Sequence, residues 1–127
     1  LELGDGTKLF SAGGNFDGSA ADLISDDVFF GGANAKAANG GNAVKIFAPG
    51  TYLPGSSISH VDTSTYPTAV MTHAIGAGIE KRVYSDIDKG ILQDIGWTLT
   101  AVPEPSSALM MLTALSIAGF RRSRNPA

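Results

Sequence analysis

Several residue types that usually carry protein chemistry are scarce or missing from this sequence. There is no cysteine, which excludes disulfide bonds and metal sites built from thiolates. There are only two histidines, so the chain cannot by itself supply a zinc site made of three imidazoles. Basic residues number 9 against 12 acidic ones, and three of the basic residues fall within positions 121–124. The rest of the chain is therefore acidic, and we expect no nucleic-acid partner.

Glycine, in contrast, is abundant, with 16 among 127 residues against an average near 7%. Residues 31–42 are small and polar between two Gly-Gly pairs, which predicts a surface loop with one helical turn. Residues 43–48 alternate as a strand does, and residues 19–27 predict a short helix. About 100 residues can bury one modest core. These features predict a single mixed α+β, loop-rich domain.

The strongest helix signal covers residues 86–95. Ser85 can cap the first turn, and two aspartates inside that turn suit the positive end of the helix dipole. Apolar residues recur on one face of the helix at Ile87, Ile91, Leu92 and Ile95. Gly96 then ends the helix before Trp97. We expect this face and Trp97 to pack against elements that the chain partly lacks.

The C-terminal segment has three parts in a fixed order. Pro103, Glu104 and Pro105 come first, fifteen uncharged residues at 106–120 follow, and an arginine cluster closes the segment. As a helix the apolar part would reach roughly 22 Å, which is short for a hydrocarbon core of about 30 Å. This pattern is typical of a processing signal rather than a permanent anchor. The arginines are Arg121, Arg122 and Arg124.

This order of parts resembles the PEP-CTERM sorting tag of Gram-negative bacteria. The resemblance implies a partner, a membrane-embedded processing enzyme of the exosortase type that cuts near the Pro-Glu-Pro motif. Positive flanks tend to stay in the cytoplasm, so we expect the arginine cluster 121–124 there and residues 1 to about 100 outside. The protein would be anchored transiently in the inner membrane and then reach the cell surface or the medium. The alternative is an ordinary apolar helix packed on the domain.

Five segments before the tail carry a second resemblance. In chain order they read FFGGANAKAANGG (29–41), AVKIFAP (43–49), YLPGSSISHVD (52–62), AVM (69–71) and ILQDIGW (91–97). Together they resemble the C-terminal half of secreted bacterial zinc-metalloprotease-like proteins, with the layout of leishmanolysin-like metzincins. The resemblance implies that residues 1–97 are the C-terminal part of a zincin-like domain without its catalytic helix. A linker at 98–102 and the sorting signal at 103–127 would follow.

The same resemblance implies roles for individual residues. His60 would be the third zinc ligand, Met71 the Met-turn residue beneath the metal, and Asp62 a group that orients the imidazole. The other two ligands of this family lie in an HExxH helix, a motif absent from this sequence. We therefore expect zinc and a peptide substrate to bind only in a longer protein, of which this chain is the C-terminal piece. Leu1 in place of an initiator methionine fits that expectation.

Other interpretations of these residues stay open. Ser56, His60 and Asp62 are the residue types of a serine-hydrolase triad, although no GxSxG turn accompanies them. Residues 86–90 resemble the start of a calcium loop, but the glutamate at its twelfth position is missing. Three function classes remain. They are the C-terminal part of a tagged zinc metalloprotease, a non-catalytic exported or extracellular-matrix protein with a degenerate protease-like domain, and a small surface-binding module.

Overall fold

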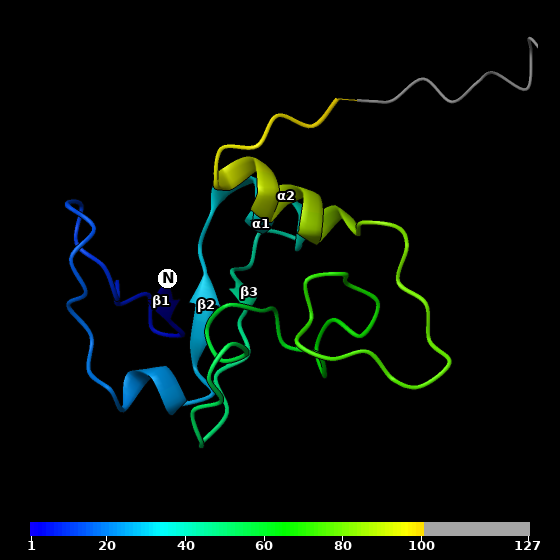
Figure 1. Cartoon of the computed structure of the whole chain (residues 1–127). Coiled ribbons are helices and arrows are strands. Elements are labelled where there is room, and N and C mark those ends of the chain that lie inside the picture. Colours follow the sequence, from blue (N-terminus) through cyan, green and yellow to red (C-terminus); the bar gives the residue numbers. More distant parts are fainter. Residues whose placement is uncertain (101–127) are drawn as a thin grey trace, which may run out of the picture.

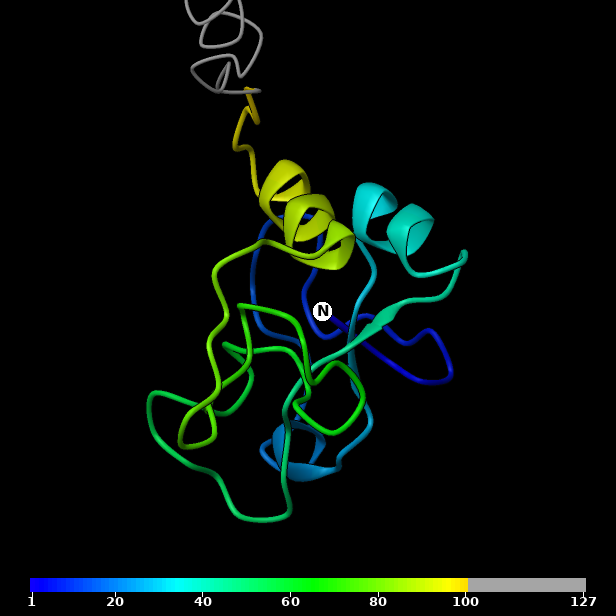
Figure 2. The same cartoon turned by 90° about the vertical axis from the view of Figure 1, so that its right-hand side faces the viewer.

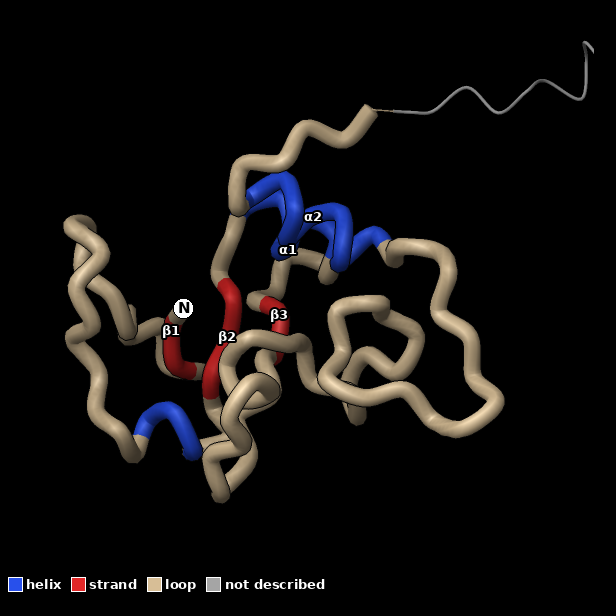
Figure 3. The backbone as a smooth tube through the Cα atoms, viewed as in Figure 1, coloured by secondary structure: helices blue, strands red, loops and turns tan. Residues whose placement is uncertain are grey.

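The structure is a computed structural model of the chain, and it describes residues 1–100. Its centre is a three-stranded antiparallel sheet in the order β1-β2-β3, surrounded mostly by loops (Figures 1 and 3). The strands are β1 Glu2–Leu3, β2 Val28–Phe30 and β3 Val44–Lys45. The helices are the 3-10 turn η1 Asp22–Ile24, α1 Ala33–Ala38 and α2 Asp86–Asp94. In register, Leu3 pairs with Val28, and Phe30 pairs with Val44.

The helices α1 and α2 lie side by side at one end of the sheet (Figure 2). Their close approach depends on Gly90 in α2. A Cβ atom at this position would lie 2.8 Å from backbone atoms of Asn34 and Ala35, which is too close for any side chain. Ala35 itself is fully buried beneath α2. Glycine on one helix and alanine on the other thus set the spacing of this pair.

The core is small and gathers around β2, β3 and the two helices. Val28 and Val44 are fully buried on neighbouring strands, and Ile91 brings α2 onto them. Partly buried side chains such as Phe30 and Ile87 pack around this centre. Within residues 1–100, the buried apolar residues are Leu9, Val28, Ala35, Val44, Ile46, Ala48, Val61, Ala69 and Ile91. This set ties the long loop after β3 to the sheet, which is what positions the candidate site.

The α2 helix confirms the prediction for residues 86–95. A capping box explains where it begins, because Ser85 Oγ accepts the backbone N–H of Asp88 at 3.1 Å. In return, the Asp88 carboxylate accepts the backbone N–H of Ser85 at 2.8 Å. The helical turn predicted within residues 31–42 is also confirmed, as α1.

Two other predicted elements are shorter than expected. The strand predicted for residues 43–48 is regular only over β3, because β2 begins at Val28. Ile46 donates its N–H to the carbonyl of Val28 at 2.8 Å and forms an isolated bridge with Val61. The helix predicted for residues 19–27 is only the turn η1. Its start is held by the Asp22 carboxylate, which accepts the Ser19 N–H at 2.6 Å, and such local bonds compete with a longer helix.

The mixed α+β class is confirmed. Within residues 1–100, no helix combines the length and apolar character needed to cross a membrane. The hydrophobic helix predicted at 106–120 lies outside the described residues, as do Pro103, Glu104, Pro105 and the arginine cluster. The zincin-like assignment of residues 1–97 stays a prediction.

Candidate functional site

His60 lies in a loop that is hydrogen-bonded to two other segments. Its carbonyl accepts the N–H of Phe47 at 2.9 Å, just beyond β3. The next residue, Val61, donates its N–H to the carbonyl of Met71 at 2.9 Å and is bridged to Thr72. The backbone therefore brings together two of the predicted site residues, His60 and Met71, from separate parts of the sequence.

The turn before His60 has an unusual backbone. Ile58 has φ of 59°, in the left-handed region that β-branched residues avoid at a cost of roughly 1–2 kcal/mol. Its N–H donates to the carbonyl of Phe47 at 2.8 Å, which fixes the turn against the strand extension. Strain of this kind is concentrated at functional sites. Here it determines how the chain enters His60.

The imidazole of His60 is held through one ring nitrogen. Nδ1 lies 3.0 Å from the carbonyl oxygen of Ser56 and 3.0 Å from Oγ of Ser59. Because a carbonyl oxygen only accepts, Nδ1 carries the proton in the contact with Ser56, and the neutral ring has its lone pair on Nε2. The hydrogen bonds described for this ring all involve Nδ1. Histidines that bind metals are commonly fixed in this way, by a carbonyl on the second nitrogen.

His60 and Met71 line one cavity of about 200 Å³. Most of its wall is apolar. The loop at residues 58–61 forms one part of the wall, and Phe30 of β2, Ile91 of α2 and Ile95 at the end of α2 contribute others. Met71 is half-buried and packs against the core. Leu1 also lines the cavity, so the start of the chain lies beside the same site. The two residues thus share one hollow, and the role of Met71 as a Met-turn residue stays a prediction.

Asp88 holds the Met71 segment from α2. Its carboxylate is fully buried and accepts the N–H groups of Val70 and Met71, each at 3.0 Å. It also accepts a hydrogen bond from the Ser85 hydroxyl group, with Oγ at 2.7 Å. Burial favours the neutral acid, but the hydrogen bonds from Ser85, Val70 and Met71 outweigh it and hold the pKa of Asp88 below its usual value. The sequence identified Asp88 only as a residue of the helix start, because its contact with Met71 is not local.

Asp62 is hydrogen-bonded to the residues that follow it. Its Oδ1 accepts Oγ of Ser64 at 2.5 Å and the N–H of Thr65 at 2.8 Å, so it organises the following turn. Burial opposes its ionisation, yet these bonds and the charge of Lys45 keep the pKa of Asp62 below its usual value. Within residues 1–100, the hydrogen bonds of the His60 ring go to serines 56 and 59 instead. That Asp62 orients a zinc-binding imidazole stays a prediction.

The second histidine, His73, is engaged elsewhere. Its ring stacks on Phe47 with centroids 3.6 Å apart and an interplanar angle of 13°. Its Nδ1 lies 2.9 Å from Oγ1 of Thr63. Among residues 1–100, no group of three or more histidine, aspartate or glutamate side chains could hold a metal ion. His60 is thus a single candidate ligand within the described part of the chain.

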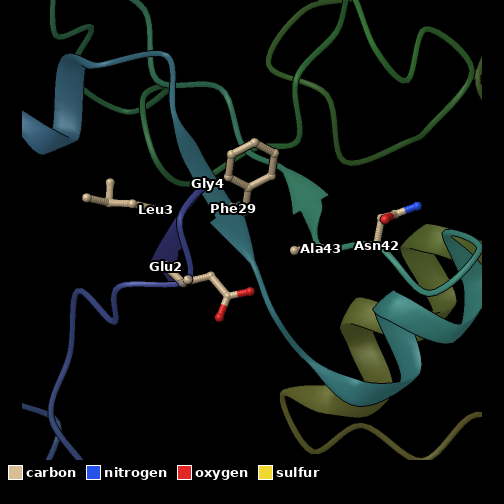
Figure 4. A pocket seen from close by; sticks show the side chains of 7 residues that line it. Glu2, Leu3, Gly4, Phe29, Asn42 and Ala43 are labelled. Atoms are coloured by element: carbon tan, nitrogen blue, oxygen red, sulfur yellow. The ribbon is translucent and has the colours of Figure 1, made fainter.

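A second hollow, of about 210 Å³, lies at the edge of β1 and is no candidate site. Figure 4 shows Glu2 and Leu3 extending from β1 in opposite directions beside Phe29. Glu2 is buried and ion-paired with Lys8, so the ammonium group of Lys8 already balances the charge of its carboxylate. The hollow is lined by few other polar side chains, among them Asn42. We assign it no function.

The tail of the chain gives the decisive comparison with known proteins. The family model for the PEP-CTERM protein-sorting motif matches residues 101–125. The chain carries a PEP-CTERM motif. This confirms the prediction made from the Pro-Glu-Pro sequence, the apolar run and the arginines. The motif supports export and sorting, and it implies processing by an exosortase, a membrane enzyme. No curated protein and no solved structure matches the chain.

Proposed function

We propose that this chain is the C-terminal part of an exported zinc-dependent metalloprotease that is tethered transiently by its PEP-CTERM motif. In this proposal His60 supplies the third zinc ligand through Nε2, and Met71 forms the apolar floor beside it. Residues 1–97 are not active alone, because the other two ligands and the general base would come from an HExxH helix. The protein is anchored in the inner membrane with its C-terminus in the cytoplasm before processing, and its substrate is a peptide.

The observation that carries this proposal is the state of the His60 ring. Nδ1 is tied to the carbonyl of Ser56, which leaves Nε2 with the lone pair, and the strained turn at Ile58 fixes the approach. The cavity beside the ring also contains Met71 and Leu1. A segment joined to the amino group of Leu1 would therefore start beside the imidazole. When bound, zinc would supply a water of lowered pKa, close to about 7, as the nucleophile.

The residues of this chain would then have simple tasks. Ser56 orients His60 through its carbonyl, and Asp88 keeps Met71 in place through its backbone N–H. Phe30 and Ile91 line the same cavity as His60 and would give the metal an apolar surrounding. A lower local dielectric strengthens the interaction of a metal with its ligands.

The test requires the full reading frame that precedes Leu1, expressed with the present sequence. His60→Ala should remove bound zinc, measured by elemental analysis, and should lower peptide hydrolysis at least about 100-fold. The matched control is His73→Ala, since His73 stacks on Phe47 and has no role in this site. The control should retain both zinc and activity. A His60→Ala protein with full zinc and full proteolysis would remove His60 from the site.

The same experiment separates this proposal from its alternative. A full-length wild-type protein that binds no zinc would instead be a non-catalytic exported or extracellular-matrix protein with a degenerate protease-like domain. The sorting function would be unaffected by that result, because it rests on residues 101–125.

A further inference from the structure

An apolar hollow of about 510 Å³ lies on α2 and the segment that follows it. Its side chains are unusually open to solvent for their size. Trp97 is 66% exposed, Tyr84 is 50% exposed and Leu99 is 40% exposed. Leu92, Lys89 and Thr100 complete the lining. We call this surface, formed by Tyr84, Lys89, Leu92, Trp97, Leu99 and Thr100, the Trp97 face.

The centre of the Trp97 face is fixed by the end of α2, and Tyr84, Leu99 and Thr100 join it from the irregular segments on either side. Gly96 has φ of 98° and reverses the chain. Its N–H donates to the carbonyl of Gln93 at 3.1 Å, and the N–H of Trp97 donates to the carbonyl of Leu92 at 2.9 Å. These two bonds form a Schellman motif, which typically places the residue after the glycine against the last apolar turn. Trp97 and Leu92 are therefore held together as one surface.

This surface does not belong to the domain core. The helix turns Ile87 and Ile91 toward the core, and Leu92 lies on the adjacent side of the helix. An indole exposed to this extent beside a tyrosine and two leucines is an unusual surface for a small domain in water. A binding partner for the Trp97 face should therefore offer an apolar region next to a polar one.

The Trp97 face is close in sequence to the sorting segment, and this short separation indicates that the face meets the membrane. Thr100 lines the hollow, and the apolar run begins at Ser106, so five residues lie between them and the chain takes six residue steps from one to the other. Even fully extended, six residues span at most about 20 Å. While residues 106–120 are in the bilayer, the Trp97 face is therefore held close to the membrane surface. The composition also fits, because Trp and Tyr concentrate at membrane–water interfaces.

We propose that the Trp97 face binds the phospholipid surface on the outer side of the inner membrane while the tail is inserted. The inference rests on the sorting part of the proposed function and is independent of zinc. An apolar run of fifteen residues is a short anchor, and a second membrane contact strengthens such an anchor. Docking also holds Pro103, Glu104 and Pro105 near the surface, where a membrane enzyme can reach them.

The proposal sets the orientation of the whole domain. The chain leaves α2 at one end of the molecule, and the loop at residues 50–55 lies at the opposite end (Figures 1 and 2). With α2 on the membrane, that loop points away from it. Lys89 is paired with Asp86 at 3.0 Å, so the face carries little net charge. Binding should therefore depend on apolar contact more than on anionic lipid.

Trp97 is the single tryptophan of the chain and reports directly on this contact. The full chain would be reconstituted in vesicles of phosphatidylethanolamine and phosphatidylglycerol, with and without lipids brominated on the acyl chain. Lipid contact should shift the Trp97 emission to the blue, and brominated lipid should quench it about twofold, as expected for an indole at the interface. The double variant Tyr84→Asn, Leu99→Asn should lose most of this quenching.

A matched control is available in the loop at the far end. Tyr52 is 47% exposed and Leu53 is 44% exposed, so Tyr52→Asn, Leu53→Asn removes the same chemistry from a different place. This variant should be quenched like the wild type. A Trp97 emission typical of water, or a blue-shifted emission that brominated lipid does not quench, would overturn the proposal. The second result would mean that a protein segment covers the face.

Flotation of the vesicles separates loss of the membrane tether from loss of docking by the Trp97 face. Protein that floats with the vesicles but shows no quenching retains its tether, and only the docking proposal fails. Protein that does not float has no inserted tail, and the membrane tether and the docking proposal fail together. A floating protein with quenching that both double variants retain would also contradict the assignment, because the contact would not involve Tyr84 and Leu99.

Discussion

Asp88 and Met71 are joined by a hydrogen bond of 3.0 Å, in which the backbone N–H of Met71 donates to Oδ1 of Asp88. Asp88 lies in the first turn of α2, and the same carboxylate caps that helix through Ser85. One buried side chain thus fixes both the start of a helix and the segment beside His60. The stability of the helix and the geometry of the candidate site are coupled through this residue.

Asp88→Asn should therefore destabilise the domain. Asparagine has nearly the same size, but it keeps only one acceptor oxygen. Its NH2 group therefore loses either the bond from Met71 on one side or the bonds from Val70 and Ser85 on the other. Losing acceptors for buried N–H groups should lower the free energy of unfolding by about 2–3 kcal/mol at pH 7. Urea unfolding of the full chain in mild detergent would measure this. An unchanged midpoint would show that Asp88 is not buried among these donors.

The same carboxylate should make the fold sensitive to acid. Its pKa in the folded state lies below its usual value of 3.8, so the unfolded chain binds more protons in that pH range. The contribution of Asp88 is fully present above about pH 5 and is lost as the pH falls through 3.8 and below. Urea midpoints at pH 7, 5 and 3 should fall mainly in the last interval, and less for Asp88→Asn. An equal fall in both proteins would assign the effect to other carboxylates.

Asp94→Ala should destabilise α1, although Asp94 lies at the end of α2. Its carboxylate accepts the N–H of Asn34 at 3.0 Å and the N–H of Ala35 at 2.9 Å, and so replaces a local cap. Removing such a cap costs about 1–2 kcal/mol. Asp86→Ala is the control, since it removes an exposed pair with Lys89 and one favourable charge at the start of α2, each worth up to about 1 kcal/mol, and leaves the cap of α1 in place. Equal effects of the two substitutions would contradict the capping role.

Gly90→Ala and Gly50→Ala should have opposite effects. At Gly90 the new methyl group would meet the backbone of Asn34 and Ala35 at 2.8 Å and push the helices apart. Overpacking costs about 1–3 kcal/mol and should exceed the gain in helix propensity of about 1 kcal/mol. At Gly50 nothing lies within 4 Å, so alanine should be neutral or stabilise by roughly 0.4–1 kcal/mol. Thermal melting of both variants compares them, and a stabilised Gly90→Ala protein would refute the close approach.

Replacing Pro103 and Pro105 with alanine should block processing of the tail. The motif match covers both residues, and an exosortase is expected to act near them. The protein should then remain longer and membrane-associated, as seen by electrophoresis of cell fractions in a host with the sorting enzyme. Pro49→Ala with Pro54→Ala is a matched control outside the motif. Normal-sized mature protein from the Pro103, Pro105 variant would count against this role.

What the sequence could predict was local. The helix α2 follows from Ser85, two aspartates and spaced isoleucines, which lie within eleven residues of one another. The cap that Asp94 gives to α1 could not be predicted, because its partner Ala35 is 59 residues away. The strand at residues 43–48 was predicted too long because its length depends on how far β2 runs beside it, and propensity does not contain that information.

The candidate site divides in the same way. The order of the segments with His60 and Met71 suggested their proximity only through a family resemblance. The contact of His60 with Ser56 could not be foreseen, since it depends on the left-handed backbone at Ile58, a conformation that isoleucine rarely adopts. The sorting motif was readable in full because its information lies in residue order alone.

Asp88 and Asp94 also determine how α2 is attached to the rest of the domain. A pulling force on the tail would reach the domain first at the end of α2. Near that end, Asp94 accepts hydrogen bonds from α1. Near the beginning of the helix, Asp88 accepts hydrogen bonds from the Met71 segment. The helix is thus fastened to two different neighbours, one near each of its ends. A pull on the tail would have to break the hydrogen bonds to α1 and those to the Met71 segment before α2 could separate from the domain.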